Sequence, residues 1–184
     1  MKKLSREPVT LKREVAAVKI PTGEKITLFK DTDLIITQAL GGTFTVMTLQ
    51  GTMASIFGQD ADALGKEVPQ EVRQLEDAVK EKKSIEDMMT AQLKTCFDPE
   101  IPYNIVDLGL VYERKILDLD GGKKKIYIRM TLTAPGCGMG DWISQDVKQK
   151  LLAIPAVEEV QVDVVWDPPW DREKMAPALR REFL

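Results

Sequence analysis

Residues 125–166 contain a strand pattern, a turn rich in glycine and proline, a helix pattern and a second strand pattern. The first strand alternates apolar and polar residues from Lys125 to Thr133. The helix pattern runs from Met139 to Ala153, and Pro155 ends it before the second strand, Val157–Trp166. Two strands joined by a crossover helix usually pair in parallel, with a right-handed connection. This order therefore predicts a small sheet that contains a parallel strand pair.

A helix and another strand precede this unit. Ser84 is a suitable helix N-cap, with Asp87 three residues later. The apolar stripe of the helix that follows consists of Ile85, Met89, Leu93 and Cys96. Val111–Leu119 has a strand pattern, and Asp120-Gly121-Gly122 is a hairpin turn before the strand at Lys125. These patterns predict an α+β protein whose small mixed sheet has helices mainly on one face.

The N-terminal part of the chain carries short strand patterns separated by turn residues. They are Glu14–Ile20, Lys25–Leu28, Asp33–Gln38, Thr43–Thr48 and Met53–Phe57. Several short strands with regular turn signals predict a small β-rich sandwich or barrel-like module. The Gly41-Gly42 pair between two of these strands fits a tight hairpin or, alternatively, a close approach of the backbone to a ligand.

Polar residues from Gly58 to Pro69 mark a predicted domain boundary. A helix that starts near Pro69 follows, with Val72, Leu75 and Val79 on one face. We therefore assign residues 1–66 to a β-rich N-terminal extension, 67–83 to a helical linker and 84–184 to a second compact domain.

Composition excludes several classes of function. The net charge of −3 gives no basic surface for nucleic acid, and no apolar run approaches the ~20 residues of a membrane span. Residues 1–8 lack the apolar core of a signal peptide, so we expect a cytoplasmic protein. The absence of histidine excludes Ser-His-Asp and Cys-His catalysis and the usual zinc sites with histidine ligands.

The two cysteines, Cys96 and Cys137, form no CxxC pair, and no disulfide framework is expected. Cys137 lies in a Gly/Pro-rich turn just before a predicted helix. Free N–H groups and the positive end of a helix lower the pKa of a thiol, so this position predicts a reactive thiolate. The alternative is an inert cysteine in a tight turn. Cys96 fits a core cysteine, although it would meet Cys137 if the following loop packs there.

Polar residues near the cysteines are further candidates. Thr131 and Thr133 share a strand face that leads into the Cys137 turn, and their hydroxyls could bond a thiolate, a sulfide or an anion. Plain β-propensity is the alternative explanation. Asp98 and Glu100 lie beside prolines and either bind a metal or orient a nucleophile, or only terminate the helix. Asp107 has the same two interpretations.

Two tryptophans flank a rigid segment near the C-terminus. Trp166 and Trp170 enclose Asp167-Pro168-Pro169, whose prolines restrict the backbone. The indole rings either pack over the sheet or form a surface for a partner.

Residues 84–184 resemble a family of small metal–sulfur cluster assembly domains. The matching blocks are Asp98–Pro102 with Ile105–Tyr112, then Thr131–Cys137, then Val164–Trp170 with Met175. The family includes SufT, the phenylacetate-pathway accessory protein PaaD and cytosolic iron–sulfur targeting factors. Gln38–Val46 and Gly58–Gly65 are similar to the N-terminal extension of longer SufT-like bacterial proteins.

The resemblance implies a non-enzymatic factor that carries iron–sulfur clusters or helps transfer them to apo-proteins. Its implied partners are an iron–sulfur scaffold and apo-client proteins. The polar cluster of the family corresponds to Asp98, Glu100, Thr131, Thr133 and Cys137, with Cys137 as the candidate iron ligand. Ala134 and Gly138 depart from the family pattern, which often has Thr or Ser and then Pro at these positions.

The number of thiols limits the mechanism. Four thiolates hold a typical iron–sulfur cluster, whereas this chain has two cysteines. One hypothesis is a labile cluster shared by the Cys137 residues of a homodimer, and another is an adaptor with no cluster of its own. A third is an enzyme with Cys137 as nucleophile and Asp98 or Glu100 as base. The absence of histidine counts against this third hypothesis.

Overall fold

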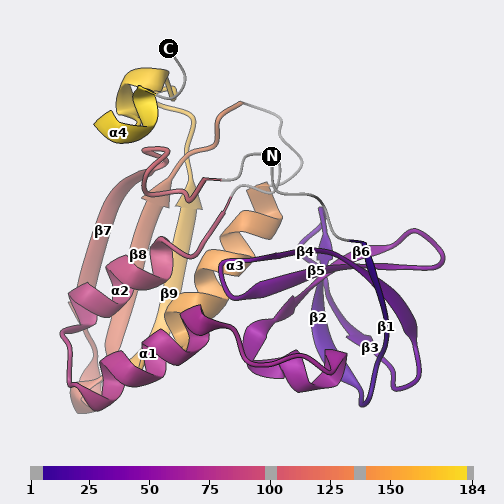
Figure 1. Cartoon of the computed structure of the whole chain (residues 1–184). Coiled ribbons are helices and arrows are strands. Elements are labelled where there is room, and N and C mark those ends of the chain that lie inside the picture. Colours follow the sequence, from indigo (N-terminus) through magenta and orange to yellow (C-terminus); the bar gives the residue numbers. More distant parts are fainter. Residues whose placement is uncertain (1–5, 98–102, 135–139, 182–184) are drawn as a thin grey trace. The chain divides into compact units, whose positions relative to one another are not determined.

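The computed structural model describes residues 6–97, 103–134 and 140–181 (Figure 1). The chain divides into two compact units, Met1–Asp77 and Ala78–Leu184. This division falls inside helix α1 (Gln70–Lys80). None of the helices in the described ranges is both long and apolar enough to cross a membrane.

The first unit contains a six-stranded antiparallel sheet. Its strands are β1 (Glu7–Thr10), β2 (Val15–Ile20), β3 (Lys25–Leu28), β4 (Asp33–Leu40), β5 (Thr43–Thr48) and β6 (Met53–Phe57). Their order across the sheet is β1-β4-β5-β6-β2-β3. The five predicted strands are confirmed, and β1 is an additional strand that the sequence analysis did not predict. It lies at the edge of the sheet, where its proline is tolerated.

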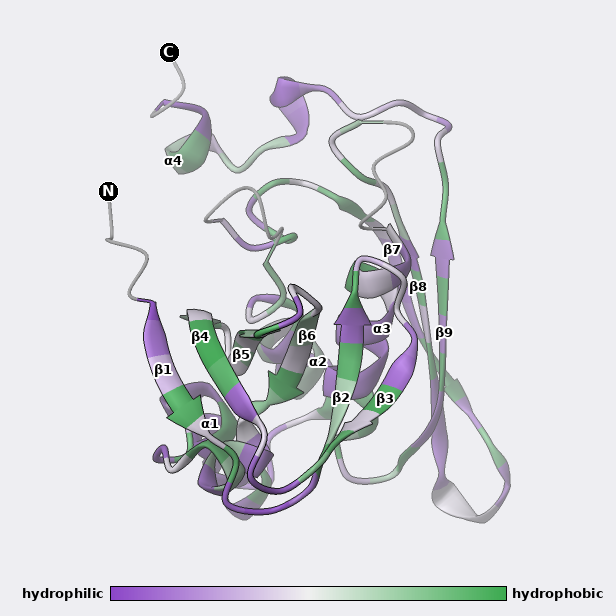
Figure 2. Cartoon of the chain, turned by 90° about the vertical axis from the view of Figure 1, so that its right-hand side faces the viewer, coloured by the Kyte–Doolittle hydropathy of each residue, from purple (hydrophilic) through white to green (hydrophobic). Residues whose placement is uncertain are grey.

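One face of this sheet encloses the core of the first unit. Val46, Ala54 and Ile56 from the inner strands are fully buried there. Figure 2 shows the apolar body of β4, another inner strand. The short 3₁₀ helix η1 (Gly58–Leu64) covers the core with Ala61, Ala63 and Leu64. A six-stranded sheet covered by η1 around one core fits the predicted barrel-like module.

The Gly41-Gly42 pair forms the hairpin between β4 and β5. Leu40 and Thr43 are paired across the two-residue loop, and both glycines have positive φ (61° and 78°). These angles are typical of a type I′ turn, which matches the twist of a hairpin. The hairpin prediction is therefore confirmed.

The second unit contains a three-stranded mixed sheet. Its elements are α2 (Ile85–Leu93), β7 (Val111–Asp118), η2 (Asp120–Gly122), β8 (Lys124–Met130), α3 (Gly140–Leu152), β9 (Val157–Val164), η3 (Arg172–Lys174) and α4 (Pro177–Arg180). β7 and β8 are antiparallel, whereas β8 and β9 are parallel and joined through α3. The predicted crossover and mixed sheet are confirmed.

Helices α2 and α3 lie on the same face of this sheet in both views (Figures 1 and 2). The residues of β8 on that face, Ile126, Ile128 and Met130, are fully buried. The α3 residues Ile143, Val147 and Leu151 are buried as well. The alternate residues of β8, Lys125, Tyr127 and Arg129, are only half-buried. The α+β prediction with helices mainly on one face is confirmed.

Ser84 caps α2 as predicted. Its Oγ accepts a hydrogen bond from the backbone N–H of Asp87 at 3.1 Å and donates one to the Asp87 carboxylate at 2.7 Å. An N-cap side chain satisfies one of the free N–H groups at a helix start. The cap therefore stabilises the first helix of the second unit.

We expect Ser84→Ala to lower the free energy of unfolding of the second unit by about 1 kcal/mol, because it removes this cap. Ser84→Thr, which keeps a hydroxyl that both accepts and donates, is the matched control and should stay close to wild type. All three tryptophans of the chain lie in the second unit, so urea unfolding followed by tryptophan fluorescence measures this effect. Equal midpoints for Ser84→Ala and wild type would contradict the role of the cap.

Candidate functional site

Four of the seven predicted site residues lie within the described ranges. Asp98, Glu100 and Cys137 lie outside them, in residues 98–102 and 135–139. The other four are Cys96, Asp107, Thr131 and Thr133. The described residues that flank these two segments define the surroundings of the candidate site.

The two ends of the segment that contains Asp98 and Glu100 are held together. Phe97 and Asn104 form an isolated antiparallel bridge, and the N–H of Ile105 donates to the carbonyl of Cys96 at 2.9 Å. Ile105 is fully buried. The chain therefore leaves and re-enters the core of the second unit at nearly the same place.

Asn104 and Asp107 organise the loop that follows. The Asn104 Oδ1 accepts hydrogen bonds from the N–H groups of Val106 and Asp107 at 3.0 and 2.8 Å. The Asn104 Nδ2 donates to the Asp107 carboxylate at 2.7 Å. Such side-chain bonds to nearby backbone groups are typical of turns. The geometry favours the turn interpretation of Asp107, and a functional role for this residue stays a prediction.

Thr131 and Thr133 lie just beyond the end of β8. The strand ends at Met130, whereas the sequence analysis extended it through Thr133 and placed both threonines on its polar face. Thr131 is fully buried. Its backbone N–H donates to the carbonyl of Leu110 at 2.8 Å, so the loop before β7 lies against this residue. Its Oγ1 has no hydrogen-bond partner among the described residues. Thr133 is half-buried.

The C-terminal segment returns to the same end of the sheet. The indole N–H of Trp170 donates to the carbonyl of Leu108 at 2.8 Å, and the N–H of Ala176 donates to the carbonyl of Asp107 at 2.8 Å. Gly109, at φ +69°, permits this approach, because a Cβ there would lie 1.9 Å from the carbonyl oxygen of Lys174. Only glycine fits both the angle and the space.

Side chains of the sheet also hold this returning segment. The hydroxyl of Tyr112 donates to the carbonyl of Pro168 at 2.9 Å, and Arg129 donates to that of Asp167 at 3.0 Å. The ammonium of Lys174 lies 4.8 Å from the centroid of the Tyr112 ring, a cation–π distance. Residues 103–112, 130–134 and 164–176, far apart in the sequence, therefore meet at one end of the three-stranded sheet.

Cys96 is a core thiol. It is 1% exposed, and its Sγ donates to the carbonyl of Gln92 at 3.6 Å. Burial raises the pKa of the Cys96 thiol well above its usual range, because the thiolate would lose its hydration. The positive charge of Lys150 lowers this pKa, and Asp146 raises it further. Cys96 is therefore protonated at neutral pH.

The sequence analysis missed a buried ion pair beside Cys96. The Lys150 ammonium donates to the Asp146 carboxylate at 2.9 Å and to the carbonyl of Thr95 at 2.8 Å. Both charged side chains are at most 9% exposed, so the pair ties α3 to the residues just after α2. The only signal in the sequence was an Asp and a Lys at i, i+4 spacing next to the apolar stripe of a helix.

The described residues contain no cluster of three or more His, Cys, Asp or Glu side chains that could hold a metal ion. Within those ranges the site therefore offers a buried threonine hydroxyl and a rigid junction of three segments, and no complete set of ligands.

The comparisons with known proteins agree with the resemblance described above. A family model for iron–sulfur cluster assembly proteins matches residues 86–164. The Fe-S protein maturation auxiliary factor YitW of Bacillus subtilis is 39% identical over 102 residues, which cover 55% of this chain and 90% of that protein. This chain belongs to the iron–sulfur cluster assembly family.

Two further relatives carry related names. The Fe-S protein maturation auxiliary factor SufT of Staphylococcus aureus is 40% identical over 79 residues, which cover 43% of this chain and 85% of that protein. An iron-sulfur cluster carrier protein of Deinococcus radiodurans is 35% identical over 77 residues, which cover 42% of this chain and 21% of the carrier. The predicted family resemblance is therefore confirmed for the C-terminal part of the chain.

We expect Cys96 to resist alkylation in the native protein between pH 7 and 9. Its raised pKa keeps the sulfur as a thiol over this range, and burial blocks access to it. Mass spectrometry after treatment with iodoacetamide, with and without urea, measures the modification of each cysteine. Labelling of native Cys96 at the rate of the urea-unfolded chain would contradict the prediction.

Proposed function

We propose that this protein is a non-enzymatic factor for the maturation of iron–sulfur proteins, which carries a cluster or helps to transfer it. Family membership and the names of the relatives support this role. Its proposed partners are an iron–sulfur scaffold and apo-client proteins, and its proposed location is the cytoplasm.

The state of Cys96 is the observation that carries the mechanism. Because this thiol is buried and protonated, Cys137 is the remaining sulfur ligand that one chain can offer. We assign the role of iron ligand to Cys137, which lies three residues before α3 begins. A helix start favours a thiolate nearby. Thr131, Thr133, Asp98 and Glu100 are the proposed polar neighbours.

One thiolate per chain leaves a cluster site incomplete. We propose that two chains each contribute a Cys137 to a labile cluster, with small thiols or the cysteines of a recipient as the other ligands. Such a site suits transfer, because a recipient with more thiolates binds the cluster more tightly. The proposed cluster is cargo and not a permanent part of the protein.

The adaptor hypothesis is the second candidate. It is supported by the number of cysteines, because a chain with Cys96 in its core has one further thiol to offer, whereas a typical cluster needs four. In this version, the protein binds a scaffold and a client and holds no cluster itself. An enzyme with Cys137 as nucleophile is a weaker candidate, because the chain has no histidine to act as its base.

Anaerobic reconstitution with ferrous iron and sulfide distinguishes the first two candidates. We expect the wild type to bind about one iron per chain, as in a two-iron cluster shared by a dimer, and to run as a dimer in gel filtration. Cys137→Ser should lose this iron and sulfide. Cys96→Ala is the matched control and should keep both, because Cys96 is not a ligand.

The outcome decides between a carrier and an adaptor. Binding that depends on Cys137 and not on Cys96 supports the carrier. If wild type and Cys137→Ser bind the same small amount of iron, the carrier version is wrong and the adaptor version remains. Equal losses in both cysteine variants would contradict the assignment of Cys96 to the core.

A further inference from the structure

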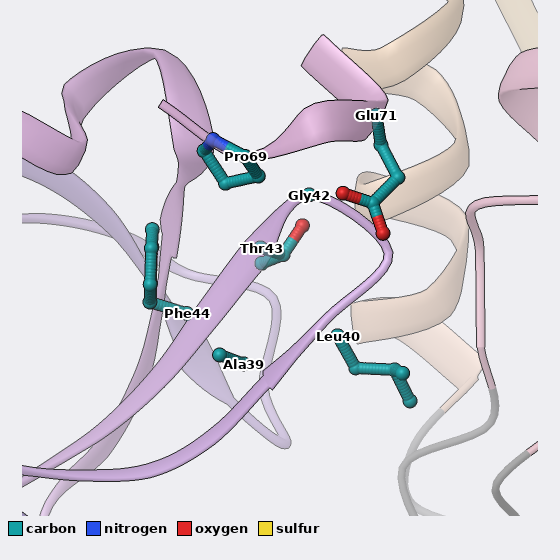
Figure 3. A pocket seen from close by; sticks show the side chains of 7 residues that line it. All are labelled: Ala39, Leu40, Gly42, Thr43, Phe44, Pro69 and Glu71. Atoms are coloured by element: carbon teal, nitrogen blue, oxygen red, sulfur yellow. The ribbon is translucent and has the colours of Figure 1, made fainter. Parts of the chain in front are cut away.

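A small cavity of about 80 Å³ lies in the first unit, beside the Gly41-Gly42 hairpin and the start of α1 (Figure 3). Its apolar walls include Leu40, Phe44 and Pro69, and its polar groups come from Thr43 and Glu71. The iron–sulfur chemistry proposed above uses none of these residues. Gly42 of the hairpin turn lines this cavity.

Thr43 presents an unsatisfied hydroxyl at this cavity. The residue is 7% exposed, and its Oγ1 is buried and has no hydrogen-bond partner among the described residues. A buried hydroxyl without a partner is unfavourable, and most such groups in folded proteins find one. Figure 3 shows the Thr43 hydroxyl and the Glu71 carboxylate both pointing toward the Gly42 end of the cavity. These two groups therefore lie at the polar end of the cavity.

The walls of the cavity are held by close backbone packing. A Cβ on Gly42 would lie 3.3 Å from the Cβ of Glu71, so the hairpin approaches the helix start closely. The N–H of Gly58 donates to the carbonyl of Gly42 at 2.8 Å. A Cβ on Gly58 would lie 2.8 Å from the ring of Pro69. The cavity is thus formed in advance, which lowers the cost of binding.

The chemistry of the lining selects the ligand. A carboxylate disfavours anions and favours a cation, and a second oxygen favours a cation with several N–H donors. The apolar walls favour a short aliphatic stem behind that charge. The volume corresponds to two or three water molecules at about 30 Å³ each, which suits an ammonium group with one or two carbons.

We propose that this cavity binds a primary alkylammonium group. The Glu71 carboxylate and the Thr43 Oγ1 accept its N–H bonds, and Leu40, Phe44 and Pro69 contact its methylene groups. The group belongs either to a free small amine or to a lysine side chain of another protein. This site is separate from the cluster function and does not depend on it.

An NMR titration of the full chain tests the proposal. Ethylammonium chloride should produce saturable shifts in the amide signals of Gly42 and Thr43. Tetramethylammonium chloride at the same ionic strength is the matched ligand control, because it has the same charge and no N–H donor. Nα-acetyl-lysine amide is titrated in a second experiment, because it represents a lysine side chain of another protein. Saturable binding of either amine supports the proposal. The amine with the lower Kd shows whether the alkylammonium group comes from a free small amine or from a lysine side chain.

Variants separate binding from a general charge effect. We expect Glu71→Gln to weaken binding at least about tenfold, whereas Glu76→Gln, on an exposed position of the same helix, should leave it unchanged. Thr43→Val should weaken binding and raise the Tm of the free protein by about 2–4 °C, because it removes the unpaired hydroxyl. Shifts that do not saturate, that tetramethylammonium reproduces, or that survive Glu71→Gln would overturn the proposal.

Discussion

The return of residues 165–176 onto the loop before β7 is the contact on which the candidate site depends. Trp170 and Ala176 donate to neighbouring carbonyls of that loop, and Gly109 leaves room for the backbone to pass. The same loop accepts the N–H of Thr131 through Leu110. One set of backbone contacts therefore fixes both the end of β8 and the loop after Asn104.

The crossover from β8 through α3 to β9 determines at which end of the sheet this junction forms. Because β8 and β9 are parallel, both strands end on the same side of the sheet, and the chain continues from β9 directly into the returning segment. Within the described ranges, the residues that resemble the family are thus also the residues that build the junction. Their separation in the sequence follows from this topology, in which each block comes from a different strand or loop.

Much of the fold follows from patterns in the sequence. The alternation in residues 125–133, the apolar stripe of α3 and Pro155 predicted the parallel pair, and Ser84 predicted the start of α2. The short edge strand β1 was missed because its four residues, with Pro8 among them, lack a clear alternation. Local patterns are strong when an element has several turns or alternations and weak when it is held only by a distant partner.

The surroundings of the site were harder to predict. Thr131 was placed on a polar strand face because its position alternates with Leu132, whereas the loop around Leu110 covers it. The sequence analysis assigned no role to Asp146 and Lys150, because their burial depends on the residues just after α2. Contacts between segments far apart in the sequence decide these outcomes, and no local pattern contains them.

We propose that Cys137 passes iron–sulfur clusters to other proteins. Cluster transfer to the apo-form of a two-iron enzyme, under anaerobic conditions and with a chelator that traps free ferrous iron, tests it most directly. We expect reconstituted wild-type protein to restore the activity of the recipient in the presence of the chelator, whereas Cys137→Ser, treated in the same way, should not. Equal recovery with the two proteins would contradict it.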